Sequence, residues 1–302
     1  VAFLSFDYGI DGASIEVAKY GKAIEKIWRN DYKTDRSPAN KISLIGGHFT
    51  KETNTIFPKN WKKITFSAAR GFNAWNGYED YFKDEFERGD ATYNNLIKKI
   101  WSQTVEHCLE LSETIVKNKI SMLVPVNVNS NPGNVSLALA IVIVSEYLGL
   151  PVWGNYHDFY WDGGKKKIER KIKNEETGIR DHFFTNAHLG EVFSVIEQIF
   201  PWDGNLWIHG PINELQSVAL TKNYGINPSK IVSVPTAIDT KKYRPCDQNE
   251  RFDILKRLNI LFSENGKHIE VIDVKAARDI IERMALERAP MLIGGENGKQ
   301  IN

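Results

Sequence analysis

The chain has 302 residues, of which 42% are hydrophobic, so it is long enough to build its own core and disorder is excluded. Its 39 basic and 38 acidic side chains leave a net charge of +1, which excludes a global field that attracts nucleic acid. No apolar run reaches the roughly 20 residues that span a bilayer, and because the sequence opens on a strand-like run we expect no targeting peptide. Two cysteines, Cys108 and Cys246, fit no metal or redox pair, so we expect a cytoplasmic protein.

Strand-like and helix-like segments alternate along most of the chain. The expected strands are residues 1–6, 41–45, 121–126, 150–153, 183–184, 206–208 and 231–234, and the expected helices are residues 15–27, 94–118, 134–149, 165–177, 188–200 and 211–224. Residues 49–90 lack clear periodicity, and we interpret them as an irregular or partly helical insertion. The alternation predicts an α/β fold with a Rossmann-like, doubly wound, mostly parallel sheet and helices on both faces.

The composition changes after Pro245. We expect residues 1–245 to form one domain and residues 246–302, which are charged, to form a helical linker or appendage. Helical patterns near residues 251–258 and 274–288 are not accompanied by strands for a second sheet. This segment is too short for another Rossmann-like domain.

A turn of small residues follows the first strand and opens the first helix. It contains Gly9, Asp11, Gly12, Ala13 and Ser14. Backbone amides at such a helix N-terminus suit a phosphate or another anion. The spacing is not that of the dinucleotide-binding fingerprint. A tight turn in which Asp11 or Ser14 caps the helix explains the same residues, so both interpretations remain open.

His157 and Asp158 directly follow the strand at residues 150–153, among aromatic residues. Ligands gather beyond the carboxyl ends of strands in an open parallel sheet, so the position favours a site. His157 can exchange a proton or a hydrogen bond, Asp158 can orient it, and the aromatic rings can stack on a sugar. A structural histidine beside a helix cap is the alternative.

Asn127 and Asn129 belong to the run at residues 127–134, which also follows a strand. Their amide side chains suit the recognition of hydroxyl groups. A turn with a helix cap requires the same residue types, so this alternative stays open.

A basic stretch at residues 165–173 is compatible with a helix. It suits an anionic membrane surface or a phosphorylated acceptor, but also a solvated helix face. The chain contains no P-loop for ATP, and its seven histidines show no metal-ligand spacing, so no metal site is predicted.

Taken together and in order, these motifs resemble the N-terminal half of GT-B glycosyltransferases, in particular the retaining family 4 enzymes. The most specific segment is residues 231–245, which is similar to the strand, Pro-Asn-Gly-Val-Asp turn and aromatic-x-Pro ending of that family. Thr236 and Ala237 stand here in place of Asn-Gly. Residues 9–14, His157, residues 185–188 and residues 212–219 also resemble family segments in the same order.

The resemblance implies transfer of a sugar from a nucleoside-diphosphate sugar to a hydroxyl acceptor, with retention and without a metal or other cofactor. It implies that the turn at residues 9–14 approaches the donor phosphates and the acceptor, and that His157 reaches the donor sugar. Asn127, Asn129 and Thr236 are further candidates for substrate binding.

In the family a second domain holds the nucleotide through a Glu-x7-Glu motif, and the pair Glu79 and Glu87 lies instead in the insertion. We therefore expect the chain to stop before that C-terminal domain and to be inactive by itself. A non-catalytic carbohydrate- or partner-binding domain is one alternative. A sugar-nucleotide epimerase, with Asp11 and Asp158 as its carboxylates, is another.

Overall fold

The computed structural model describes residues 1–31, 41–164 and 178–236, and beyond them Arg244, Asp247, Glu250 and residues 260–262 and 269–271. The chain divides into two compact units, Val1–Thr236 and Ala237–Asn302. In the second unit β9 (Ile260–Phe262) and β10 (Ile269–Val271) pair antiparallel, which corrects the expectation of a segment without strands. The helical patterns expected near residues 251–258 and 274–288 lie outside the described residues.

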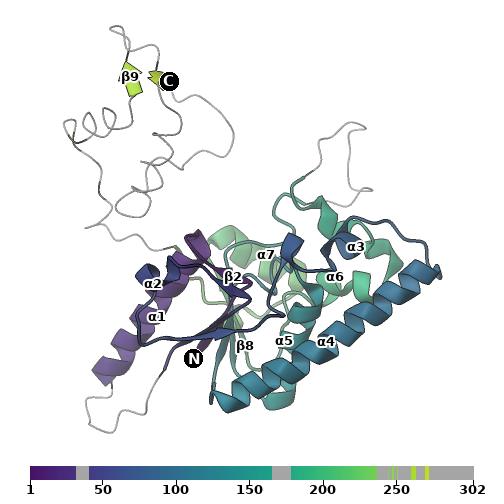
Figure 1. Cartoon of the computed structure of the whole chain (residues 1–302), viewed down its shortest axis with the longest axis horizontal. Coiled ribbons are helices and arrows are strands. Elements are labelled where there is room, and N and C mark those ends of the chain that lie inside the picture. The colour runs from purple at the N-terminus through teal and green to yellow at the C-terminus, as the bar shows by residue number, and fades with distance from the viewer. Residues whose placement is uncertain are drawn as a thin grey trace. The chain divides into compact units, whose positions relative to one another are not determined.

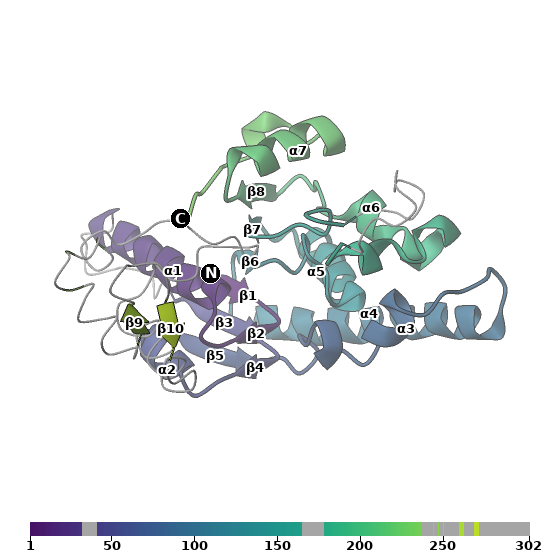
Figure 2. The ribbon, with the colours of Figure 1, turned by 90° about the horizontal axis from the view of Figure 1, so that it is seen from above.

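The first unit is built on a six-stranded sheet in the order β5-β3-β1-β6-β7-β8 (Figure 2). Every neighbouring pair of these strands is parallel. The strands are β1 (Ala2–Leu4), β3 (Ser43–Gly46), β5 (Lys62–Thr65), β6 (Leu123–Pro125), β7 (Val152–Tyr156) and β8 (Trp207–Pro211). From β1 the chain winds outward through β3 and β5, then returns to β6 and winds the other way. The predicted doubly wound sheet is confirmed, and its switch point lies between β1 and β6.

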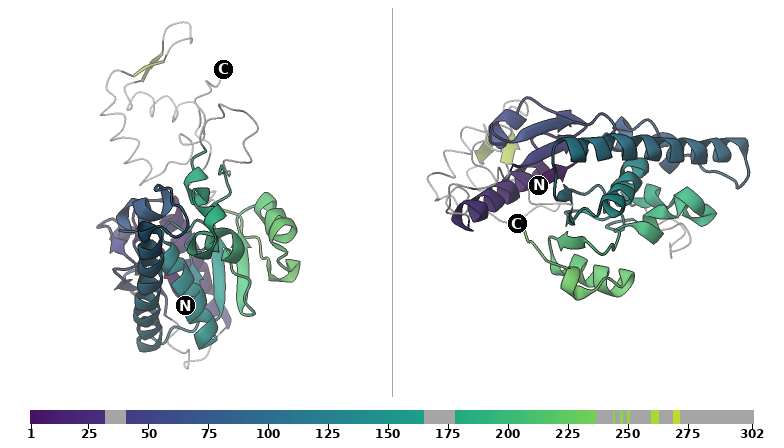
Figure 3. Two further views of the ribbon diagram at one scale, coloured as in Figure 1. Left: turned by 90° about the vertical axis from the view of Figure 1, so that its right-hand side faces the viewer. Right: turned by 90° about the horizontal axis from the view of Figure 1, so that it is seen from below.

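Helices cover both faces of this sheet, as predicted (Figures 1 and 2). The alternation of side chains along β1 separates the two faces, because Phe3 packs with the core beneath α1 (Gly12–Asp31) and α2 (Thr53–Ile56). Its neighbour Leu4 packs with the opposite core, beneath α4 (Ala91–Lys117) and α5 (Val135–Leu148). The helix α7 (Glu214–Tyr224) lies at the β8 end of the sheet, away from α2 at the β5 end (Figure 3).

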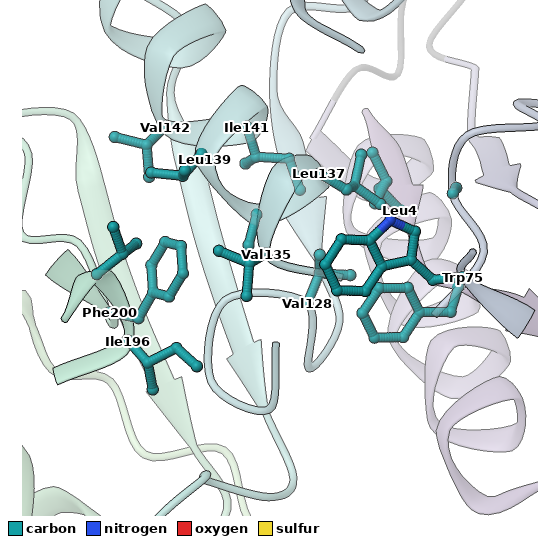
Figure 4. Close-up of a cluster of buried hydrophobic side chains, with 14 of the residues drawn as sticks. Leu4, Trp75, Val128, Val135, Leu137, Leu139, Ile141, Val142, Ile196 and Phe200 are labelled. Carbon is teal, nitrogen blue, oxygen red and sulfur yellow. The ribbon is translucent and has the colours of Figure 1, made fainter. Parts of the chain in front are cut away.

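The helix α5 lies at the centre of the larger core (Figure 4). It is apolar on nearly all sides, and every residue from Val135 to Val142 is buried, as expected for a helix packed between a sheet and another helix. Asn134 caps its first turn by accepting a hydrogen bond from the Leu137 amide, and Gly149, in the left-handed conformation, ends it. The cap therefore fixes where the chain leaves the loop that follows β6.

The segment at residues 49–90 is more regular than predicted. It contains α2, the edge strand β5, the 3₁₀ helix η1 (Phe72–Ala74) and α3 (Tyr78–Phe82). At the start of this segment, β4 (His48–Phe49) pairs in parallel with β2 (Asp7–Tyr8) in a separate two-stranded sheet. The strand β5 was missed because its sequence, Lys-Lys-Ile-Thr, carries the polar side chains that an exposed edge strand tolerates.

Two further expectations are corrected between β7 and β8. Residues 183–184 form no strand but belong to the 3₁₀ helix η3 (Asp181–Phe184), where Phe183 packs edge-on against Phe82 at 5.1 Å. The helix expected at residues 188–200 is broken into η4 (Ala187–Leu189), η5 (Glu191–Phe193) and α6 (Val195–Ile199). The break coincides with Gly190, whose φ is +77°. The helix and basic stretch expected from residue 165 lie outside the described residues.

The strand predicted at residues 231–234 is not formed; after the 3₁₀ helix η6 (Pro228–Lys230) the segment runs beside β8 with only an isolated parallel bridge between Ile231 and His209. The Val232 amide donates to the His209 carbonyl at 2.8 Å, and the Val234 amide donates to the Pro211 carbonyl at 2.9 Å. Across the part of the chain that the structure describes, no helix has both the length and the apolar character needed to cross a bilayer.

Candidate functional site

The loops that follow β1, β6 and β7 meet at the carboxyl edge of the sheet, at its switch point. This is where ligands bind in open α/β sheets. The loop that begins at Asn127 contacts the pair His157 and Asp158 there, and the turn at residues 9–14 follows the neighbouring strand, near enough for the charge of Asp11 to act on His157. The fold and these loops define a doubly wound α/β domain with a polar edge.

Asp11 caps helix α1 and closes the turn on itself. One carboxylate oxygen accepts a hydrogen bond from the Ser14 amide at 2.8 Å. The other accepts from the Ser14 hydroxyl at 2.7 Å and from the Gly9 amide at 3.2 Å. The capping role left open by the sequence is therefore present. The carboxylate also fills the position nearest the helix N-terminus that an external anion would take.

The amides of Gly12 and Ala13 also belong to this turn and precede the first hydrogen bond within the helix. The first amides of a helix have no partner within the helix, and Ile15 is the first to donate back, to the Asp11 carbonyl at 3.1 Å. No atom lies within 4 Å of where a Cβ on Gly12 would stand. The space in front of this backbone is open, so a ligand can approach it closely.

Asn127 joins the loop after β6 to the loop after β7. Its Oδ1 accepts hydrogen bonds from the backbone amides of His157 at 2.7 Å and Asp158 at 3.2 Å. Its own backbone is left-handed, with φ +61°, a conformation that asparagine tolerates better than most residues. The predicted binding residue Asn127 thus sets the position of the His157 backbone.

The carboxylate of Asp158 is held away from the imidazole. It pairs with the Arg180 guanidinium at 3.1 Å and accepts from the Asn127 side chain at 3.3 Å. The partner of the imidazole is Asn155 in β7, whose Oδ1 lies 2.9 Å from His157 Nε2. The orienting role expected of Asp158 is thus carried by Asn155, while Asp158 contributes charge.

The His157 ring is partly buried, and this burial lowers its pKa below the ordinary value. The negative charges of Glu16, Asp158 and Asp11 oppose that shift, whereas Lys19 adds to it. The effect of Asp11 on His157 shows that the turn after β1 and the imidazole share one electrostatic environment. A predominantly neutral imidazole is the consequence near neutral pH.

Two contributors to this site, Glu16 and Gln216, were not identified from the sequence, and Asn155 was recognised only as a member of the cluster around His157, without a role. The Gln216 side chain, from the first turn of α7, donates to the His157 carbonyl at 3.1 Å. Glu16 is only 4% exposed, although it is a carboxylate. The sequence did offer one signal for Glu16 and Asn155: each is a polar residue among the apolar residues of a helix or a strand, which indicates a buried polar side chain.

Two predicted binding residues are placed differently. Asn129 is fully buried, and its side chain donates to the carbonyl of Ala138 in α5 at 3.0 Å. It therefore points into the protein and not toward the edge of the sheet. Thr236 is exposed at the last residue of the first unit. Among the described residues, no group of three histidine, cysteine or acidic side chains is arranged to hold a metal ion.

No protein-family profile matches the chain. In sequence it is 25% identical over 283 residues to mannosylglucosylglycerate synthase from Petrotoga mobilis, a match that covers 92% of this chain and 52% of the relative. The chain thus spans about half the length of the curated relative it matches. This match agrees with the resemblance that the motifs indicated.

Three solved structures align with most of the chain at low identity. A glycosyltransferase from Rickettsia africae ESF-5 is 11% identical with a TM-score of 0.40, covering 84% of this chain and 48% of its own. WaaG, a glycosyltransferase involved in lipopolysaccharide biosynthesis, is 11% identical with a TM-score of 0.39, covering 86% and 51%. UDP-GlcNAc 2-epimerase from Methanocaldococcus jannaschii is 12% identical with a TM-score of 0.33, covering 77% and 45%.

Proposed function

We propose that this chain is the acceptor-side domain of a GT-B glycosyltransferase, which transfers a sugar from a nucleoside-diphosphate sugar to a hydroxyl acceptor with retention. The observation that carries the proposal is the convergence of the turn at residues 9–14, Asn127 and His157 at the switch point of the sheet. The sequence match to mannosylglucosylglycerate synthase over nearly the whole chain supports the same activity. By that similarity, the acceptor is a small polyhydroxylated compound.

The chemistry assigned to this domain is binding and orientation. The outward amides of Gly12 and Ala13, at the positive end of the α1 dipole, stabilise negative charge on the diphosphate leaving group. The Asp11 carboxylate repels an anion placed directly on the helix axis, so the diphosphate approaches from the side of these amides. His157 forms a hydrogen bond with a sugar hydroxyl. No residue is assigned here as a general base.

The epimerase alternative is less well supported by the two carboxylates on which it depends. Asp11 is engaged by three hydrogen bonds from its own turn. Asp158 is paired with Arg180. A carboxylate that moves protons at a sugar carbon must reach the substrate, whereas Asp11 is engaged by its own turn and Asp158 by the side chains of Arg180 and Asn127.

Calorimetry with nucleoside-diphosphate sugars tests the proposal. The 302-residue chain is titrated alone and again with a nucleotide-binding second domain joined after Asn302. We expect weak binding by the chain and clear binding, with transfer to a polyol, once the second domain is present. Tight nucleotide-sugar binding by the chain alone contradicts a split site. Binding of a carbohydrate without any transfer by the two-domain form favours the non-catalytic alternative.

In the two-domain form, His157→Ala removes the hydrogen bond to the sugar. One neutral hydrogen bond contributes about 0.5–1.5 kcal/mol, so we expect kcat/KM to fall roughly three- to tenfold, or further if the bond strengthens in the transition state. Thr236 was also predicted to bind substrate, and its side chain is exposed. Thr236→Ala in the two-domain form therefore tests that prediction separately. Unchanged turnover by His157→Ala removes the histidine from the proposed site.

A further inference from the structure

Beneath the site lies a cluster of buried polar groups that the proposed chemistry does not use. Its members are Glu16 and Tyr20 on α1, and Asn155 on β7, with exposed fractions of 4%, 8% and 0%. Glu16 Oε2, Tyr20 Oη and Asn155 Nδ2 are all buried without a hydrogen bond of standard geometry. Buried polar atoms of this kind are costly unless they are paired, and here they lie close enough to pair with one another.

Contacts between α1 and β7 hold the cluster together. The Tyr20 ring packs edge-on against Trp153, with ring centroids 5.4 Å apart, which fixes the phenol over the sheet. Its hydroxyl lies within interaction range of both Glu16 and Asn155. The other oxygen of Glu16 pairs with Lys19 Nζ at 2.5 Å, so this carboxylate is charged and held in place.

The hydrogen-bonding capacity of each group permits only one direction through the cluster. A carboxylate only accepts, so the Tyr20 hydroxyl donates to Glu16. The phenol oxygen then accepts from the Asn155 amide nitrogen, which leaves the Asn155 carbonyl oxygen toward the imidazole. That oxygen, 2.9 Å from His157 Nε2, also only accepts.

We propose that Glu16, Tyr20 and Asn155 form a hydrogen-bond relay that holds His157 as the neutral tautomer with its proton on Nε2 and its lone pair on Nδ1. All three are positioning residues, because they act on the ligand only through the imidazole. The imidazole then presents an acceptor, which recognises a hydroxyl group. A protonated imidazole would present donors on both nitrogens and would select a phosphate or carboxylate instead.

The charges that face His157 agree with this arrangement. Glu16, Asp11 and Asp158 favour its protonation, while burial and Lys19 oppose it. Burial is the largest of these effects, so the neutral ring prevails. The relay adds a choice between the two neutral tautomers, which the surrounding charges alone do not make. That the Nδ1 lone pair accepts from a sugar hydroxyl rests on the proposed function, whereas the relay itself does not.

Long-range ¹H–¹⁵N NMR of the imidazoles in the 302-residue chain tests the relay. The His157 signals are assigned by their loss in His157→Gln. We expect the Nε2–H tautomer in the unaltered protein and a shift toward a mixture in Tyr20→Phe, which keeps the ring on Trp153 and removes only the hydroxyl. An Nδ1–H tautomer in the unaltered protein, or a tautomer ratio unaffected by Tyr20→Phe, overturns the proposal.

A second arm measures the His157 titration in Glu16→Gln. In the unaltered protein the negative charge of Glu16 raises the His157 pKa, so its removal is expected to lower that pKa further. Glu25→Gln is the matched control on the same helix, where Glu25 accepts from Trp61 instead, and it leaves the His157 titration unchanged. Equal titrations in all three proteins overturn the relay. These readouts need no ligand, so an intact relay in the 302-residue chain together with no transfer by the two-domain form refutes the proposed function alone.

Discussion

The turn at residues 9–14 opens α1, and the buried cluster lies next to it, with Glu16 and Tyr20 on α1 and Asn155 on β7, but the polar groups of the two regions are satisfied in opposite ways. In the turn, the Asp11 carboxylate satisfies three donors within five residues of itself. In the cluster, three polar atoms are buried without a standard hydrogen bond. The comparison teaches that the turn is locally complete, while the polar groups that position His157 depend on contacts across the sheet.

Acid is expected to have the largest effect, on buried histidines rather than on the turn. His209, fully buried beside Tyr156, has its pKa lowered to about 4, primarily by burial. The unfolded chain binds a proton near pH 6.5, so the stability from this group is full above that pH and is lost as pH falls toward about 4. The loss amounts to roughly 3 kcal/mol.

Urea denaturation across this pH range measures that loss. His209→Gln keeps a polar partner for Tyr156 and cannot titrate, so we expect a flatter pH profile than in the unaltered protein. His157 acts in the same direction, since burial lowers its pKa as well. Parallel profiles for the unaltered protein and His209→Gln would show that burial of this imidazole does not govern the acid response.

Removal of the Asp11 carboxylate has an intermediate effect and tests whether the turn is a cap. Asp11→Ala is expected to lower the free energy of unfolding by about 1 kcal/mol, because an N-cap hydrogen bond is lost. Asp11→Asn retains a capping oxygen and should stay close to the unaltered protein. Urea denaturation near pH 7 separates the two variants. Equal stability of all three proteins contradicts the capping role.

The smallest effect on stability is expected for Gly12→Ala. The added methyl group meets no atom within 4 Å, and alanine is the better helix former, so unfolding should change by no more than a few tenths of a kcal/mol. The same methyl group stands in the space where a ligand would approach the backbone. Calorimetry on the two-domain form should therefore show weaker nucleotide-sugar binding. Unchanged affinity places the diphosphate elsewhere.

The site was only partly predictable from the sequence. Gly9–Ser14, Asn127 and His157 were identifiable because each follows a strand, and strand ends of a parallel sheet share one edge. Asn129 met the same criterion but faces the interior, since the side-chain direction in a turn depends on backbone angles that residue type does not specify. Glu16 and the role of Asn155 were missed because a polar residue within an apolar run has no periodic signal of its own.

The sequence by itself determined most of the alternation of helices and strands and the end of α5 near Gly149, and it offered Asp11 as one of two candidates for the helix cap, because these features depend on residues a few positions apart. It also carried the resemblance that the synthase match confirmed. Only the tertiary structure decided that β5 joins the sheet as an edge strand, that residues 183–184 pack as a 3₁₀ turn, and that Glu16 and Asn155 both lie near Tyr20. The physical reason is that these features depend on burial and on pairing between segments far apart in the sequence. Such contacts can override the local conformational preference of a segment, or decide its structure where that preference is weak.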